Sequence, residues 1–204
     1  YDISADLGTL SAPNYDFIFV KGSLTIGKAR ITVTAENKSR LYGSANPQFT
    51  ATYNGFVNGQ ILSTSDIKGL PALTTVASVS SEVGTYAIDG TTGSLVSNNY
   101  DFAFVSGSLT VGKVVVTVTA ENKSRLYGQS NPQLTVTYNG FVNGQSLASS
   151  GITGTPAVQT SATVLSPVGP YDITVGTGSL SSTNYSFNLV NGKLAIEKAK
   201  LTIT

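Results

Sequence analysis

The chain has 204 residues, of which only 11% are charged, and its formal net charge is +1. So little positive charge excludes phosphate-backbone attraction as the main source of affinity, which argues against a nucleic-acid partner. Histidine and cysteine are both absent, so no imidazole or thiol is available as a nucleophile, general base or soft-metal ligand, and no disulfide can form.

The hydrophobic content favours a folded chain that does not enter a membrane. Hydrophobic residues make up 40% of the sequence, which is too many for a chain that stays disordered. A membrane-spanning helix needs about 20 consecutive apolar residues, and the sequence contains no such run. We therefore predict folded units without direct membrane insertion.

The sequence repeats itself with a period of 85 residues, as the equivalent positions Tyr15, Tyr100 and Tyr185 show. Residues 34–43 and 119–128 are identical. Catalytic groups are seldom repeated along one chain, whereas structural or multivalent surfaces often are, so we expect no enzyme. We expect an excerpt of a longer repetitive polypeptide. Its predicted parts are the C-terminal part of a preceding repeat (1–28), two complete repeats (29–113 and 114–198) and the first strand of a following repeat (199–204).

Alternation of apolar and polar residues predicts β-strands throughout the repeat. The first begins near Ile31, where Ile31, Val33 and Ala35 alternate with threonines. A short helical turn near Ser63–Ile67 is the best exception, because β-branched residues and glycines interrupt every longer helical window. The further strands of the first complete repeat are predicted at Phe49–Tyr53, Pro71–Val76, Gly84–Asp89, Tyr100–Val105 and Ser108–Val111.

Turn residues support an all-β fold. Asn58-Gly59 and Asn143-Gly144 can adopt the positive φ angles of tight turns. Ser106-Gly107 lies between two predicted strands and is interpreted as the turn of a closing hairpin. Six or seven short strands in one repeat predict tandem small β-sandwich units of immunoglobulin-like type. A β-grasp-like arrangement around one short helix is the alternative.

The connection between repeats is short. Gly112-Lys113-Val114 alone separates the last strand of one complete repeat from the first strand of the next. A flexible tether would need many glycine, serine or proline residues. The sequence therefore predicts a stiff rod of repeats, each in contact with its neighbours in the same chain.

One group of charged residues is a candidate ligand face. If the strand phase that begins at Ile31 continues, these residues share the face of the threonines, where they could bind a carbohydrate or an anionic partner. The alternative interpretation is a solvated strand face whose charges block sheet-to-sheet aggregation. The six residues are Glu36, Lys38, Arg40, Glu121, Lys123 and Arg125.

A second group combines a Tyr-Gly pair with an Asn-Pro pair in each complete repeat. The functional interpretation is a ligand-facing loop with an aromatic platform. The structural interpretation, which we favour, is a packed tyrosine, a glycine with positive φ and a proline that fixes a turn. The acidic residues do not cluster as a calcium site requires, so we predict no metal and no cofactor. The motif residues are Tyr42, Gly43, Asn46, Pro47, Tyr127, Gly128, Asn131 and Pro132.

The order and spacing of these motifs resemble the MBG family of YGX type. The resemblance covers nearly the whole chain, and the motifs recur in the second repeat. It implies an extracellular all-β stalk module of the kind that occurs in tandem in large bacterial adhesins and secreted exoproteins. It implies no catalytic residue and identifies no ligand. The matching elements are Tyr42-Gly43, Asn46-Pro47, Gly55-Phe56, Gly84 to Tyr86, Asn99-Tyr100 and Gly107 to Val111.

We therefore expect a spacer segment of a bacterial cell-surface or secreted adhesin that extends a distal binding region from the cell. Two alternatives stay open. A repeated, weak carbohydrate-binding module for biofilm polysaccharide, or for a host or bacterial surface, predicts an exposed pair of aromatic residues in each unit. A filament subunit joined by strand sharing is the other.

Overall fold

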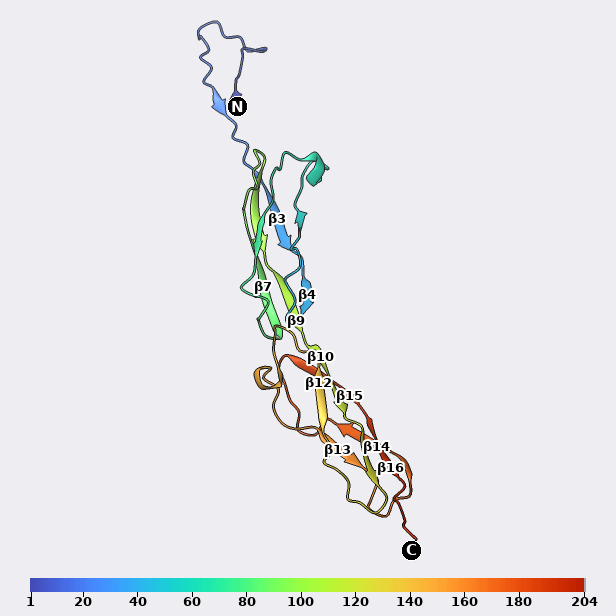
Figure 1. Ribbon diagram of the computed structural model, residues 1–204. Helices are drawn as coiled ribbons and strands as arrows, with labels where there is room; N and C mark the ends of the chain where they lie inside the picture. Colours follow the sequence, from blue (N-terminus) through green and yellow to red (C-terminus); the bar gives the residue numbers. More distant parts are fainter. Residues whose placement is uncertain (204) are drawn as a thin grey trace. The chain divides into compact units, whose positions relative to one another are not determined.

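Figure 1 shows a computed structural model that describes residues 1–203. The chain forms two compact units, and their bounds differ from those of the sequence repeats. The first unit contains Tyr1–Thr34, Ala51–Ala72 and Gly90–Val105. The second contains Ala35–Thr50, Leu73–Asp89 and the chain from Ser106 onward, and therefore includes the whole of the second complete repeat.

The described chain is all-β, as predicted. Two single turns of 3₁₀ helix, η1 (Leu62–Thr64) and η2 (Leu147–Ser149), are its only helical elements among residues 1–203. The strands are β1 (Asp2–Ile3), β2 (Gly22–Ser23), β3 (Ala29–Ala35), β4 (Lys38–Leu41), β5 (Ala51–Asn54), β6 (Ala72–Thr74), β7 (Gly84–Thr91), β8 (Tyr100–Val105), β9 (Gly107–Gly112), β10 (Val114–Ala120), β11 (Lys123–Leu126), β12 (Val136–Asn139), β13 (Ala157–Thr160), β14 (Gly169–Gly176), β15 (Tyr185–Val190) and β16 (Gly192–Glu197).

The first unit is built around the three-stranded sheet β5-β3-β8, in which β3 and β8 run parallel. The alternation predicted from sequence is confirmed in β3, because Ile31 and Val33 are buried. They pack in one cluster with Tyr100 and with Ile67, which follows η1. β1 and β2 form a separate two-stranded ladder, in which Asp2 pairs with Ser23.

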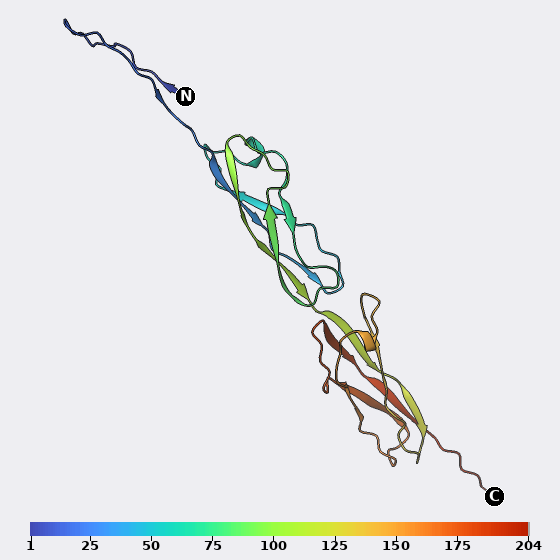
Figure 2. The same ribbon diagram turned by 90° about the vertical axis from the view of Figure 1, so that its left-hand side faces the viewer.

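The second unit contains most of the sheet β4-β9-β7-β6 and both sheets of the second repeat. Those two sheets have the orders β12-β10-β15 and β11-β16-β14-β13, and their strands can be followed in Figures 1 and 2. Val116 and Val118 of the first sheet share one buried core with Ile173 and Leu194 of the second. This arrangement is a small β-sandwich with mixed sheets, and the same element order recurs in the first repeat.

The predicted closing hairpin is wrong. β8 and β9, on either side of Ser106, do not pair with each other: β8 pairs in parallel with β3, whereas β9 pairs in parallel with β4 and antiparallel with β7. In the second repeat β15 pairs in the same way with β10, and β16 with β11 and β14. One residue, Asn191, separates β15 from β16, so the chain passes directly from one sheet to the other. A Cβ on Gly192 would lie 2.6 Å from the Ala120 carbonyl oxygen. Glycine is therefore required here for a close backbone crossing, not for a turn.

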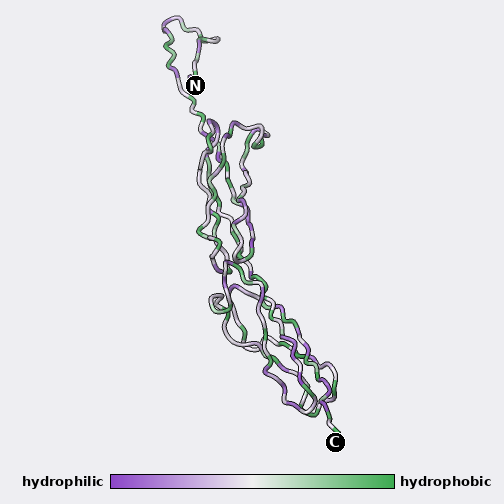
Figure 3. The backbone as a smooth tube through the Cα atoms, viewed as in Figure 1, coloured by the Kyte–Doolittle hydropathy of each residue, from purple (hydrophilic) through white to green (hydrophobic). Residues whose placement is uncertain are grey.

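The other predicted turns agree better with the structure. Asn58 and Gly59 have φ angles of 54° and 69°, and Asn143 and Gly144 have angles of 56° and 67°. These are the left-handed values that favour the Asn-Gly pair. Figure 3 shows hydrophilic and hydrophobic residues alternating along the strands, which is the pattern that places half of each strand in a core.

Candidate functional site

The charged residues predicted as a ligand face have different environments. Arg40 and Arg125 are only 8% and 6% exposed, which corrects the predicted solvent-facing position. The Nε atom of Arg40 donates to Asn46 Oδ1 at 2.7 Å, and its Nη atoms donate to the carbonyl oxygens of Leu41 and Ser78. The Arg40 guanidinium is thus held by neighbouring chain segments.

Glu36 and Lys38 form a partly exposed ion pair, with Lys38 Nζ 3.0 Å from Glu36 Oε2. Thr50 donates its hydroxyl to the same carboxylate. The Thr50 hydrogen bond, followed by the hydrogen bond and charge of Lys38, holds the pKa of Glu36 below its ordinary value. Glu121, Lys123 and Thr135 repeat this arrangement in the second repeat. A ligand for these residues remains a prediction.

The hydrogen bonds of the Asn46 side chain account for the asparagine of the Asn-Pro motif. Its side-chain oxygen accepts from Arg40, and its Nδ2 donates to the Ala77 carbonyl oxygen at 2.7 Å. Asn131 makes the equivalent bonds to Arg125 and to the Ala162 carbonyl oxygen. The asparagine therefore joins the buried arginine to the segment that precedes β7 or β14. Pro47 and Pro132 directly follow these asparagines in the chain.

Tyr42 lies in the hydrophobic core of the second repeat, although it belongs to the first. Its ring packs edge-to-face on Tyr185, with centroids 5.7 Å apart and an interplanar angle of 80°. Gly43 follows with φ +78°, and a Cβ at this position would lie 2.5 Å from Val142 Cγ2. Both residues belong to the second compact unit, together with the residues that they contact.

Two hydrogen bonds complete this contact. Gln145 joins the two tyrosines, because its Oε1 accepts from the Tyr185 hydroxyl and its Nε2 donates to the Tyr42 hydroxyl at 3.2 Å. The backbone N–H of Val83 donates to Asn184 Oδ1 at 2.9 Å. We call the four residues of the second repeat that receive Tyr42, Gly43 and Val83 the second-repeat socket: Val142, Gln145, Asn184 and Tyr185.

The identical Tyr-Gly pair of the second repeat has a different environment. Tyr42 is 5% exposed, whereas Tyr127 is 47% exposed. A Cβ on Gly128 would meet no atom within 4 Å among the described residues, in contrast to Gly43. The local fold is the same, since the Tyr42 N–H donates to Gly112 and the Tyr127 N–H to Glu197, each at 2.8 Å. The difference therefore comes from the second-repeat socket.

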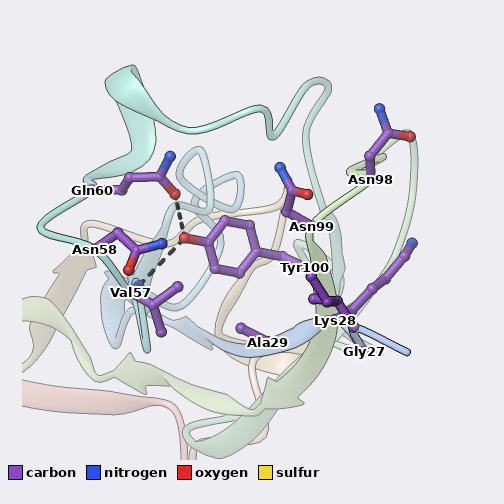
Figure 4. A pocket seen from close by; sticks show the side chains of 10 residues that line it. Gly27, Lys28, Ala29, Val57, Asn58, Gln60, Asn98, Asn99 and Tyr100 are labelled. Carbon is purple, nitrogen blue, oxygen red and sulfur yellow. Dashed lines mark hydrogen bonds between the residues drawn. The ribbon is translucent and has the colours of Figure 1, made fainter. Parts of the chain in front are cut away.

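The first repeat has the counterpart of this socket, displaced by 85 residues in the sequence and contained in the first compact unit. We call Val57, Gln60, Asn99 and Tyr100 the first-repeat socket. These residues line a cavity of about 310 Å³, together with the chain around Lys28. Figure 4 shows the Tyr100 hydroxyl donating to Gln60 and accepting from the Val57 N–H. The socket is thus preformed by its own repeat.

Sequence reasoning missed the sockets. It predicted a strand that begins at Tyr100, whose side chain is buried, but it assigned no binding role to the Gln60 and Asn99 positions. The nine-residue segment 52–60 recurs unchanged at 137–145 and ends at Gln60 and Gln145. That identity was the available signal, although it does not reveal which residue the glutamine contacts.

Two further features of residues 1–203 concern clustered acidic residues and buried polar groups. Among residues 1–203, no group of three or more acidic residues could hold a metal ion. No buried side-chain nitrogen or oxygen in that range lacks a hydrogen-bond partner. No helix in that range is long and apolar enough to cross a membrane. The arrangement that stands out chemically is the tyrosine contact between the repeats.

Comparison with known proteins gives one family. The family model described as MBG domain (YGX type) matches residues 31–110 and residues 116–195. The two matches are tandem and lie within the complete repeats recognised from the sequence. No curated protein matches the chain.

Proposed function

The chain belongs to the MBG domain (YGX type) family, and from this premise we propose that it is a spacer segment of a bacterial cell-surface or secreted adhesin. MBG domains occur as repeats in surface proteins. In this role each folded repeat adds length and holds a distal binding region away from the cell, and the chain itself catalyses no reaction. Repeat proteins suit such a task because each unit needs only its neighbours for stability.

The observation that carries the proposal is the Tyr42 contact. A spacer keeps a distal region at a distance only if adjacent repeats resist bending relative to each other. A long flexible linker would not provide this stiffness. Lys113 alone separates β9 from β10. Tyr42 and Val83 are packed against the second-repeat socket inside one compact unit. A covalent link of one residue and a packed aromatic pair together support a restricted junction.

Spin-label distance measurements test this restriction. The chain has no cysteine, so Thr85→Cys and Thr137→Cys provide two unique labelling sites on exposed strand positions of β7 and β12. We expect one narrow distance distribution, which Tyr42→Ala broadens and the matched change Tyr127→Ala leaves unchanged. A broad distribution in the chain with Tyr42 intact would contradict the spacer role.

The carbohydrate-binding alternative has less support. It calls for an exposed aromatic pair in each repeat, and among residues 29–203 Tyr127, at 47%, is the most exposed aromatic residue. Titration of the chain against a panel of bacterial exopolysaccharides distinguishes the two functions. Saturable binding would favour the carbohydrate-binding module over the spacer.

A further inference from the structure

The second repeat begins and ends in two chain segments that lie side by side and run parallel (Figures 1 and 2). We call residues 114–127, which contain β10 and β11, the entry segment, and residues 184–197, which contain β15 and β16, the exit segment. Lys113 joins the entry segment to the first repeat. Because the two segments run parallel, Val114 lies at one end of the pair and Glu197 at the other.

One register joins these segments over their whole length. Val114 pairs with Tyr185 in one sheet, and Lys123 pairs with Leu194 in the other. At the sheet change between them, Asn122 Oδ1 accepts from the Lys193 N–H at 2.8 Å, which keeps the same separation of 71 positions. The crossing from one sheet to the other therefore does not interrupt the pairing.

Backbone hydrogen bonds close both ends of the pair. The Val114 N–H donates to the Asn184 carbonyl oxygen at 3.1 Å, and the Tyr127 N–H donates to the Glu197 carbonyl oxygen at 2.8 Å. The bonds thus extend from the residue at which the chain enters the repeat to the end of the exit segment. A load that passes along the chain through this repeat meets these bonds.

Tension applied to the two ends of the repeat pulls the entry and exit segments in opposite directions along their length. Sliding by one residue moves each backbone group by about 3.3 Å relative to its partner, which breaks the hydrogen bonds between the segments together. Two strands pulled apart from one end lose their bonds one after another instead, which needs less force. Sliding also displaces buried side chains such as Val116 and Leu194 from their shared core.

We propose that each complete repeat is a tension-bearing clamp, whose strength comes from the parallel pairing of its entry and exit segments. The first repeat has the same register, with Ala29 paired to Tyr100 in the first compact unit and Lys38 paired to Leu109 in the second. The inference goes beyond the spacer role, which needs resistance to bending and not to tension. It rests on the strand pairing alone, and the spin-label distances test the spacer role separately.

Single-molecule force measurements on the full chain test the clamp by comparing two pulling directions. The chain has no cysteine, so pairs of introduced cysteines define where the handles attach. Val115→Cys with Lys198→Cys loads the two segments along their length. Val115→Cys with Thr183→Cys pulls at one end of the pair and peels the segments apart. All three of these residues are exposed.

The lengthwise direction should be the stronger one. At the same loading rate we expect it to need at least about twice the unfolding force of the peeling direction, because forced unfolding is governed by the barrier to rupture. It should unfold the repeat in a single step that frees about 300 Å of contour length, at roughly 3.6 Å per residue. Equal forces in the two directions, or lengthwise unfolding in several small steps, would overturn the proposal.

Asn122→Ala provides a variant that acts on the clamp within the repeat. It removes one of the bonds that break together, so we expect the lengthwise unfolding force to fall by roughly a fifth. The peeling force should stay unchanged, because peeling begins at Val115. The matched control is Asn188→Ala, at an exposed asparagine of β15, which should alter neither force. An equal loss in both directions after Asn122→Ala would mean general destabilisation and would contradict the clamp.

Discussion

The guanidinium groups of Arg40 and Arg125 each hold together three segments of their repeat. In the first repeat the arginine contacts Asn46 and the Ser78 carbonyl oxygen, and Asn46 contacts the Ala77 carbonyl oxygen. A buried charge of this kind is acceptable only when its hydrogen bonds are satisfied. The cluster therefore stabilises the loops around β4.

Replacing Arg40 should expose this role. We expect Arg40→Ala to lower the free energy of unfolding by about 3 kcal/mol, because partners of a charged donor are left unpaired in a buried place. Arg40→Lys should not restore stability, since an ammonium group cannot reproduce the planar donor geometry. Urea denaturation measures both, with the exposed Arg30→Ala as control. A lysine variant as stable as the parent would refute this explanation.

The lowered pKa of Glu36 predicts that this residue's contribution to the stability of the fold depends on pH in the acidic range. Its pKa is lowered first by the Thr50 hydroxyl and then by Lys38. A carboxyl with a lowered folded-state pKa stabilises the fold above its unfolded pKa, and this contribution is lost as pH falls through the lower folded value. The relevant window therefore lies below the ordinary value of 4.5.

Thr50→Val should raise the pKa of Glu36 toward that ordinary value and reduce the loss of stability in this acidic window. Carboxyl carbon shifts followed by NMR during an acid titration measure the change. Glu121, whose own partner Thr135 is unchanged, serves as the internal reference. An unaltered pKa for Glu36 would show that the threonine is not the main cause.

The exposure of single residues was only partly predictable from sequence. The alternation that begins at Ile31 places Arg40 on the polar face, and that phase holds through Ala35. The strand then ends and resumes at Lys38 in a different sheet. Because the chain changes sheets, the inward-facing side changes too, and Arg40 becomes buried. Periodicity within one strand carries no information about such a switch.

At the scale of elements, two long chain segments run parallel and both change sheets at their middle. β3 continues into β4 as β8 continues into β9, and each pairs with its counterpart across the change. Asn37 Oδ1 accepts from the Ser108 N–H at 2.8 Å beside this point. The crossing is therefore fixed by an asparagine on one segment and a glycine on the other.

Gly107 should tolerate no side chain at this crossing. A Cβ there would lie 2.5 Å from the Ala35 carbonyl oxygen, whereas a Cβ on Gly112 of the same strand would lie 3.5 Å from the flexible end of Leu41. We expect Gly107→Ala to cost about 2 kcal/mol through overpacking, and Gly112→Ala to cost much less. Denaturant midpoints compare the two variants. Equal midpoints would contradict a close crossing at Gly107.

Strand positions could be predicted from sequence, but strand pairing could not. Tyr100–Val105 was predicted with the bounds that β8 has, because alternation and aromatic residues are local signals. Ser106-Gly107 looks like a hairpin turn for the same local reason. The pairing of β8 with β3 joins residues 71 positions apart, such as Ala29 and Tyr100. No pattern inside one strand specifies so distant a partner.

At the scale of the whole molecule, repetition supplies the contacts between neighbouring repeats. The Tyr42–Gln145 hydrogen bond joins residues 103 positions apart, and the same pair of surfaces is available wherever one repeat follows another. The sequence indicated that neighbouring repeats touch, because their connection is short. It could not indicate that the tyrosine of the YGX motif makes the contact, since the identical Tyr127 is exposed.

The most direct test of this account compares Tyr42→Ala with Tyr127→Ala in the full chain, because the ten residues that end with each Tyr-Gly pair are identical. We expect Tyr42→Ala to lower the free energy of unfolding by about 3 kcal/mol, as for other buried aromatic residues. Tyr127→Ala should cost less than about 1 kcal/mol, because Tyr127 is about half exposed and lies outside any such contact. Urea denaturation gives both values. Equal losses would contradict the claim that Tyr42 couples the two repeats.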